Sequence, residues 1–316
     1  MIHAYAIEPD LAAVWGKPSD YRYFRDKFGL GTPRILFEIP KFTNWRSKVL
    51  RAAEALGVPD MDMERLTALL EILGERRCKR CEACYDGTLE WLVNAECEYD
   101  RLPFAAILAR GNPRGHKAVV MGPNIGVSMD ERWDKPAAAF PARQPEEMAN
   151  AVAAMLANCC EVRFVDPHFG PDHERHRKVL EAMLKALMVG REAMPQRVEI
   201  HCGDKLSLKH FDLEAAKMAV RLPNGLQISF FRWCEKDGGE RFHDRYILTD
   251  LGGVIVAGGL DDSSEGQTDN INLMPREQYE FRLRQFTRGD TPPFDPVDQP
   301  ASIIGQESSR RVSRTR

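Results

Sequence analysis

The sequence predicts a mixed α/β protein made of two units. Apolar runs of strand length alternate with segments of helical spacing along most of the chain, and this alternation favours sheets that are covered by helices. A proline-punctuated stretch at residues 140–145 precedes a regular helical pattern, so we expect the boundary there. A chain of 316 residues also has room for about two domains. We therefore predict a smaller α/β unit over residues 1–140 and a second unit over residues 145–288.

The first unit is expected to begin with an aromatic-rich arm over residues 1–28, whose rings pack on their own domain. Leucines spaced three or four residues apart then predict helices, and short apolar runs predict strands. In order, we expect a strand over residues 34–39, helices over residues 45–56 and 62–73, and strands over residues 104–108 and 118–121 joined by a basic hairpin loop. The sequence does not indicate what this unit recognises.

The second unit is expected to alternate helices and strands before it ends in a hairpin. The expected helices span residues 146–158, 173–187 and 213–220, and the expected strands span residues 162–165, 198–201 and 226–231. A hairpin over residues 241–256 follows, and residues 271–286 should close the unit. This order favours a mixed or largely parallel sheet flanked by helices. Residues 289–316 are rich in Pro, Ser and Arg, so we expect a disordered tail there.

Composition limits the kind of partner that the chain can bind. The net charge of −3 and the pI of about 6.3 give no overall basic field, so any phosphate-rich partner must be held by a local site. No run of about 18 apolar residues is present, and acidic residues follow soon after the start of the chain. We expect a cytoplasmic protein without a transmembrane segment.

The most informative stretch is the predicted hairpin, which carries His243, Arg245 and Asp250 in the pattern His-x-Arg-x4-Asp. Alternate side chains of a strand share a face, so His243 and Arg245 are expected to project together. A neutral imidazole can attack phosphorus, and a guanidinium can hold two phosphoryl oxygens. Farther on, Gly258 and Gly259 would let a phosphate approach bare backbone N–H groups. These residues indicate phosphate chemistry.

This pattern resembles the His-x-Lys-x4-Asp and Gly-Ser-x-Asn signature of the phospholipase D superfamily, present here in one copy. The resemblance covers residues 145–288 and implies a phospholipase D-like mixed sheet flanked by helices. It also implies that His243 is the nucleophile, that Arg245 binds phosphate and that Asp250 supports the motif structurally. Asp269 lies at the distance at which small members of the superfamily carry a carboxylate that orients the histidine.

This sequence departs from the signature by three replacements and one insertion. Arg245 replaces a lysine, Gly259 replaces a serine and Asp261 replaces an asparagine, and one residue is inserted between Asp250 and the glycine pair. Together with the stretch Val-Asp-Pro-His-Phe that contains His168, these residues resemble more closely the phospholipase D-like C-terminal domain of proteins that carry a microtubule-interacting and trafficking module. That domain binds membrane phosphoinositides without catalysis. His168 is therefore expected at the rim of the same site.

Two functions follow from this resemblance. The first is a metal-independent phosphodiesterase, in particular a nuclease, in which His243, Arg245 and Asp269 act on the substrate through a phosphohistidine. Its leaving group needs a second acid, which the symmetry mate of a homodimer or His168 would supply. The alternative is an inactive module in which the same pocket, with Gly258, Gly259 and Asp261, binds phosphoinositide or nucleic-acid phosphates. The missing Ser and Asn favour the module, whereas the retained His, cation and carboxylate favour the enzyme.

One cluster of cysteines offers a different site. The cluster consists of Cys78, Cys81, Cys84 and Cys97, and four thiolates suffice for zinc. The spacing is not that of a common structural zinc module. We therefore expect reduced, incidental thiols, with no metal and no other cofactor in the chemistry.

Overall fold

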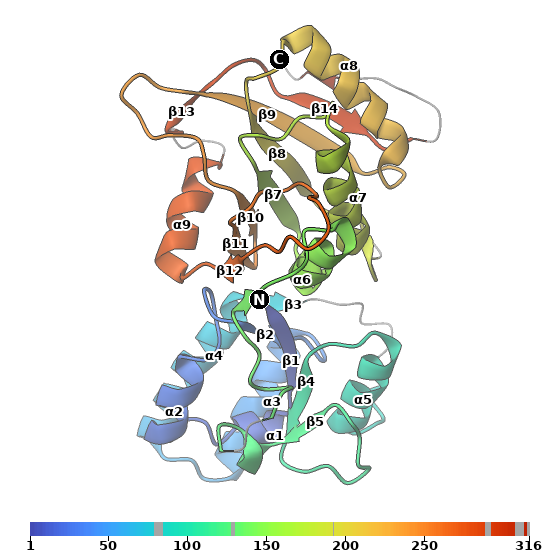
Figure 1. Ribbon diagram of the computed structural model, residues 1–316. Coiled ribbons are helices and arrows are strands. Elements are labelled where there is room, and N and C mark those ends of the chain that lie inside the picture. Colours follow the sequence, from blue (N-terminus) through green and yellow to red (C-terminus); the bar gives the residue numbers. More distant parts are fainter. Residues whose placement is uncertain (79–84, 128–129, 192, 288–291, 307–312, 315–316) are drawn as a thin grey trace. The chain divides into compact units, whose positions relative to one another are not determined.

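The computed structural model describes residues 1–78, 85–127, 130–191, 193–287, 292–306 and 313–314 (Figure 1). The chain divides into two compact units, Ile2–Ala137 and Ala138–Arg316, with Met1 grouped with the second. The division falls shortly before the proline-punctuated stretch at residues 140–145. No helix within the described ranges combines the length and the apolar character that a membrane span requires.

The first unit is built on a parallel sheet with the strand order β3-β2-β1-β4-β5. Its strands are β1 (His3–Ile7), β2 (Arg34–Phe37), β3 (Arg77–Cys78), β4 (Ala106–Ala109) and β5 (Val119–Met121). Its helices are α1 (Pro9–Ala12), α2 (Pro18–Arg25), α3 (Phe42–Ala55), α4 (Asp60–Glu75) and α5 (Trp91–Arg101), with a short 3₁₀ turn η2 (Gly122–Asn124). Every residue of β2 and β4 is buried, as expected for a parallel sheet covered on both faces.

Two expectations for the first unit are wrong. The aromatic-rich arm contains β1, the central strand of the sheet, because a strand buried on both faces shows no polar alternation that would reveal it. The basic loop after β4 is not a hairpin, since β4 and β5 pair in parallel. The aromatic side chains of the arm do pack on their own unit, where Trp15, Phe24 and Phe28 belong to the core around Tyr5.

The second unit contains a larger mixed sheet with the order β15-β14-β9-β8-β7-β10-β11-β12-β6, and β13 also pairs with β9. Its strands are β6 (Ala138–Ala139), β7 (Glu161–Val165), β8 (Arg197–Gly203), β9 (Gln227–Glu235), β10 (Tyr246–Thr249), β11 (Gly252–Val256), β12 (Ile271–Leu273), β13 (Phe294–Pro296), β14 (Ala301–Ile304) and β15 (Ser313–Arg314). Its helices are α6 (Pro145–Asn158), α7 (Glu174–Met188), α8 (Leu208–Met218) and α9 (Arg276–Gln285), with a 3₁₀ turn η3 (Ala219–Arg221).

Helices cover both faces of this sheet. Figure 1 shows α6, α7 and α8 on one side and α9 on the other. On the first side, Phe164 of β7 and Ile200 of β8 line one small cavity with Met183 of α7. On the α9 side, a side chain at Gly253 would lie 2.9 Å from the Tyr279 ring, so this glycine lets the helix pack closely on β11. The chain is thus mixed α/β, with one parallel sheet and one mixed sheet, each flanked by helices.

The expectation of a disordered tail is wrong for the described part of residues 292–314. β13 and β14 both pair with β9, and Phe294, Ala301 and Ile303 are buried. The alternation of buried and accessible residues in β14 is a strand signal, but it covers only four residues among prolines and serines. The strand forms because β9 offers an unpaired edge that β14 completes.

This packing predicts unequal costs for two neighbouring isoleucines. Ile303 is 1% exposed and Ile304 is 43% exposed. We expect Ile303→Ala to lower the free energy of unfolding by about 2–5 kcal/mol through the lost burial and the cavity, and Ile304→Ala to change it by less than about 0.5 kcal/mol. Urea denaturation followed by circular dichroism measures both. Two equally small effects would show that β14 is not packed on the unit.

Candidate functional site

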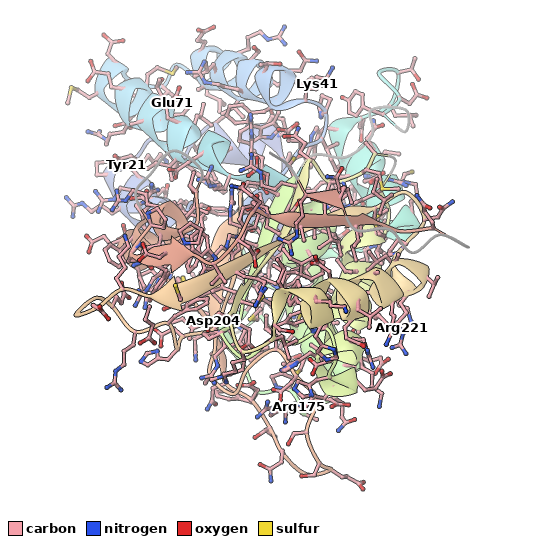
Figure 2. The ribbon with its side chains drawn as sticks, turned by 90° about the horizontal axis from the view of Figure 1, so that it is seen from above. Tyr21, Lys41, Glu71, Arg175, Asp204 and Arg221 are labelled. Atoms are coloured by element: carbon pink, nitrogen blue, oxygen red, sulfur yellow. The ribbon has the colours of Figure 1, made fainter. Side chains whose placement is uncertain are left out.

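The carboxyl ends of three strands meet at one edge of the larger sheet. β7 and β8 run in parallel, and β11 runs in the same direction because β10 is antiparallel to both β7 and β11. The start of β10 lies at this edge too, since Tyr246 pairs with Val165 at the end of β7. Arg175 near the start of α7 and Asp204 directly after β8 can be located in Figure 2. Open α/β sheets bind ligands at such edges.

Asp166 is the structural centre of this edge. Its side chain is buried, and Oδ1 accepts a hydrogen bond from the backbone N–H of His168 at 2.8 Å. Oδ2 accepts one from the backbone N–H of Leu260 at 2.8 Å, and the Asp166 N–H donates to the carbonyl of His201. The carboxylate therefore joins the loops that follow β7 and β11, and the backbone N–H of the same residue ties them to β8.

Arg245 directly precedes β10 and faces this carboxylate. Its Nε lies 4.0 Å from Asp166 Oδ1, a long ion pair, and its side chain is 26% exposed. The buried Nε makes no hydrogen bond to any described residue. A guanidinium keeps its charge at all ordinary pH values and offers five donors in a planar fork. Arg245 therefore has donors free for an anionic ligand.

Two further arginines are held by Asp261, in the loop after β11. Arg143 donates to Asp261 Oδ1, and Arg175 Nε lies 3.2 Å from Oδ2. Because two guanidinium groups already engage both oxygens, Asp261 positions and partly neutralises these arginines. A carboxylate in that state has no oxygen left for a ligand, so Asp261 could affect a ligand only through these two arginines.

The glycine pair serves close packing inside the protein. A side chain at Gly258 would lie 2.7 Å from Asp269 Oδ2 and 2.9 Å from a terminal nitrogen of Arg143. Gly259 has a φ of +114°, which favours glycine, and a side chain there would lie 3.4 Å from Asp166 Oδ2. The expected open approach for a phosphate is therefore filled by protein side chains at Gly258. The N–H of Gly259 donates no hydrogen bond to another described residue.

His168 lies at the rim of this edge, on the side of Lys205. Its Nδ1 is 2.6 Å from Lys205 Nζ, so the neutral ring accepts a hydrogen bond from the ammonium group. Burial lowers the pKa of His168, and the charges of Lys205 and Arg245 lower it further, while Asp166 and Asp261 act in the opposite direction. At neutral pH the ring is uncharged, with Nε2 protonated and able to donate.

His243 is not on a strand, contrary to expectation, because β10 begins only at Tyr246. The preceding segment is fixed by side chains instead: Phe242 is buried and packs against Phe294 with ring centroids 4.7 Å apart. The His243 side chain is 65% exposed, and its Nδ1 lies 2.6 Å from Asp244 Oδ1. The ring is therefore accessible from solvent, with Nε2 free.

Asp269 does not orient His243. Its Oδ1 accepts the backbone N–H groups of Gly258 and Asn270, both at 2.7 Å, and its buried Oδ2 has no hydrogen-bond partner. Among the described residues, no hydrogen bond or ion pair joins the two side chains. The expected carboxylate contact is made by Asp244, which Tyr246 and Arg282 hold in place.

Asp250 has a structural position in the turn between β10 and β11. Its Oδ1 accepts the backbone N–H groups of Cys160 and Glu161, at 2.7 and 3.1 Å. These bonds tie the turn to the start of β7. Asp250 therefore lies at the opposite end of the strands from Asp166 and cannot touch a ligand there.

Sequence reasoning missed part of the site. Asp166 and Asp244 were not predicted as site residues, although they lie next to His168 and His243 in the sequence. Asp166 and Lys205 also follow the ends of predicted strands, and this position could have indicated them. Arg143 gave no signal, because it lies in the proline-punctuated boundary, far in sequence from the motif. Its approach to Asp261 becomes visible only in three dimensions.

The cysteine hypothesis falls largely outside the described residues. Cys81 and Cys84 are not described, while Cys78 is buried in β3 and Cys97 is exposed on α5. Over the described ranges, no group of three or more His, Cys, Asp and Glu side chains has the geometry of a metal site.

Comparisons with known proteins add no relative. No protein-family model, no curated protein and no solved structure matches the chain. A function for the chain must therefore be inferred from its own residues and their geometry.

The contact between His168 and Lys205 predicts a measurable change in titration. Removing the ammonium group in Lys205→Ala should raise the pKa of His168 toward its ordinary value, because a positive charge beside the ring no longer opposes protonation. Lys209→Ala, at an exposed position on α8, should leave it unchanged. The ring resonances in a ¹H–¹³C NMR titration report both. An unchanged midpoint in Lys205→Ala would show that the two groups do not interact.

Proposed function

We propose that the second unit is a phospholipase D-like module that binds a phosphate group at the carboxyl edge of its sheet, without turnover. The observation that carries this proposal is the Arg245 guanidinium, which has a buried Nε without a hydrogen-bond partner and only a 4.0 Å ion pair to Asp166. A buried donor on a charged group that lacks a partner costs free energy. A phosphate oxygen would supply the missing acceptor in a charge-assisted hydrogen bond.

The groups around Arg245 suit the same ligand. Lys205 adds a compact, exposed cation, and His168 adds an N–H donor on its neutral ring. Cations combined with uncharged donors are typical of phosphate recognition. Because the whole chain has a net charge of −3, binding would depend on this local group.

The arrangement of segments supports the phospholipase D-like part of the proposal. The three stretches that carry the resemblance contain His168, Arg245 and Asp261. Asp166, in the first stretch, lies 4.0 Å from Arg245 Nε of the second and accepts the backbone N–H of Leu260 in the third. Stretches separated by almost a hundred residues of sequence thus contribute to a single site, as the resemblance implies.

The state of His243 favours binding over catalysis. Its side chain is 65% exposed, and the carboxylate of its partner Asp244 is itself 41% exposed. Exposed ion pairs contribute little free energy, so this pair does not fix the ring firmly. Catalytic groups need a preorganised geometry, and the buried carboxylate expected to supply it, Asp269, is engaged by backbone N–H groups.

A second candidate is the metal-independent phosphodiesterase, and one observation favours it. His243 Nδ1 lies against Asp244 while Nε2 is free. A nucleophilic histidine needs this arrangement, in which one ring nitrogen faces a carboxylate and the other can attack. Nε2 would form a bond to phosphorus as the bond to the leaving oxygen breaks, and a second histidine would protonate that oxygen. His168 or the His243 of a homodimer partner would serve, with a nucleic acid as substrate in a cytoplasmic setting.

The phosphate proposal predicts different effects for two nearby arginines. Arg245→Ala should weaken binding of a phosphate ligand about tenfold to a hundredfold, the effect of losing a charge-assisted hydrogen bond. Arg241→Ala removes the same charge from an exposed position in the same segment and should change the affinity less than twofold. Flotation with vesicles containing phosphatidylinositol 4-phosphate and anisotropy with a short single-stranded DNA test both variants.

The two arms of this experiment separate the ligand sources. Binding to the vesicles alone assigns the site to a lipid headgroup, and binding to DNA alone assigns it to a nucleic-acid backbone. Equal losses in Arg241→Ala and Arg245→Ala would contradict the proposal, since binding would then follow net charge and not the site.

Turnover distinguishes the second candidate. As a binding module, the protein should release no nitrophenol from bis(p-nitrophenyl) phosphate in EDTA. If the enzyme proposal holds, hydrolysis should persist in EDTA, disappear in His243→Ala and fall by at least about tenfold in Asp244→Asn, because the amide no longer stabilises the imidazolium. Asp269→Asn is the matched control and should leave turnover unchanged, since that carboxylate does not contact the ring. Hydrolysis retained in His243→Ala would exclude the phosphohistidine route.

A further inference from the structure

The C-terminal segment over residues 294–304 is joined to β9 by strand pairing and by side chains. β13 and β14 both pair with β9 (Figure 1), and Asp298 lies between these two strands. Asp298 Oδ2 accepts a hydrogen bond from Arg232 Nη1 at 2.7 Å, and Oδ1 accepts one from Arg314 Nη1 at 2.8 Å. The Val297 N–H also donates to the Arg232 carbonyl. Asp298 thus fixes the segment to a side chain of the central sheet.

Arg232 links this segment to the loop after β8. The residue is 3% exposed, and its Cζ lies 4.9 Å from the centroid of the Phe211 ring. Its Nη2 donates to the backbone carbonyl of Leu206 and lies 3.5 Å from that of Asp204. The planar fork of a guanidinium reaches a carboxylate and a carbonyl at the same time. Arg232 therefore connects Asp298 to a loop that contains no helix or strand.

The loop that Arg232 holds carries Lys205, one of the groups at the phosphate site. Lys205 lies between the two residues whose carbonyls face the guanidinium. Its Nζ is 2.6 Å from His168 Nδ1. The Lys205 side chain is exposed, so the position of its ammonium group depends on the backbone of the loop. Arg232 therefore acts on the site without touching it.

The burial of Arg232 makes this link sensitive to Asp298. A buried guanidinium needs a partner for its charge, and within the described part of the chain Asp298 is the carboxylate that forms an ion pair with it. Without this partner Arg232 would turn toward water, and its bond to the Leu206 carbonyl would be lost. The loop is therefore held in place by a residue of the C-terminal segment.

We propose that Asp298 and Arg232 are positioning residues of the phosphate site, which place Lys205 beside His168 and so make phosphate affinity depend on the docking of the C-terminal segment. The effect on affinity rests on the proposed function of the site, whereas the placement of Lys205 does not. A change that detaches residues 294–304 from β9 would weaken the site although none of these residues contacts the ligand.

The pKa of His168 tests the placement of Lys205 without any phosphate ligand. Asp298→Asn keeps the shape of the side chain but removes its charge, so Lys205 should leave the ring and the pKa should rise, as in Lys205→Ala. Losing the Asp298 carboxylate by itself would lower a histidine pKa, so a rise identifies the release of the loop. In the Lys205→Ala background, Asp298→Asn should raise the pKa no further. A ¹H–¹³C NMR titration of the full chain measures each variant.

Two further variants complete this titration. Asp295→Asn, on β13 with a side chain that is 59% exposed, is the matched control and should leave the pKa of His168 unchanged. Arg232→Lys keeps the charge beside Asp298 but lacks the fork that reaches the loop, so it should raise the pKa even if Asp298→Asn does not fold. An unchanged or lower pKa in folded Asp298→Asn or in Arg232→Lys would overturn the proposal. An equal rise in Asp295→Asn or in the Lys205→Ala background would also overturn it.

Affinity measures the consequence for the proposed function. Asp298→Asn and Lys205→Ala should each weaken binding of the short single-stranded DNA or of the phosphatidylinositol 4-phosphate vesicles about threefold to tenfold. The double variant should bind no more weakly than either single variant. Binding that is weakened by Lys205→Ala and unaffected by Asp298→Asn would overturn the link to affinity. If neither probe binds the unmodified chain, the proposed function fails, and the His168 titration still decides whether Asp298 places Lys205.

Discussion

The candidate phosphate site depends on a single buried carboxylate, Asp166. Its two oxygens hold the backbone N–H groups of His168 and Leu260, so the loops after β7 and β11 are fixed to each other. Its negative charge also lies within 4.0 Å of Arg245 Nε, which allows a guanidinium to stay at a partly buried position. Replacing this carboxylate would release both loops and leave the cation without a partner, so we regard it as the constraint on which the site depends.

The charges at this edge are the reason why we propose binding and not catalysis. Asp261 engages Arg143 and Arg175, whereas Arg245 has only its long ion pair to Asp166 among the described residues. Attraction for an anion requires only that donors are available and partly shielded from water. Nucleophilic attack requires in addition that His243 is held rigidly, and its exposed pairing with Asp244 does not provide this. The same geometry therefore suits recognition more than turnover.

Much of the fold was predictable, because the periodic helices and the hairpin of the second unit depend on local patterns. β1 was missed since a strand buried on both faces lacks alternation, and β14 was missed since its four residues lie in a polar, proline-containing stretch. The resemblance predicted that His168, Arg245 and Asp261 lie close together, and all three lie at the carboxyl ends of the strands. The partner of His243 was not predictable. Sequence spacing does not reveal that local backbone N–H groups engage the Asp269 carboxylate, so that Asp244 and not Asp269 contacts the ring.

If Arg245 donates to a phosphate group, as we propose, its own Nε–H resonance reports this most directly. In a ¹H–¹⁵N NMR titration of the full chain with inorganic phosphate, the Arg245 signal, assigned by its loss in Arg245→Lys, should shift in a saturable manner. The signal of the exposed Arg241 should shift little and without saturation. An Arg245 signal that does not move, or that only follows Arg241, would contradict the account.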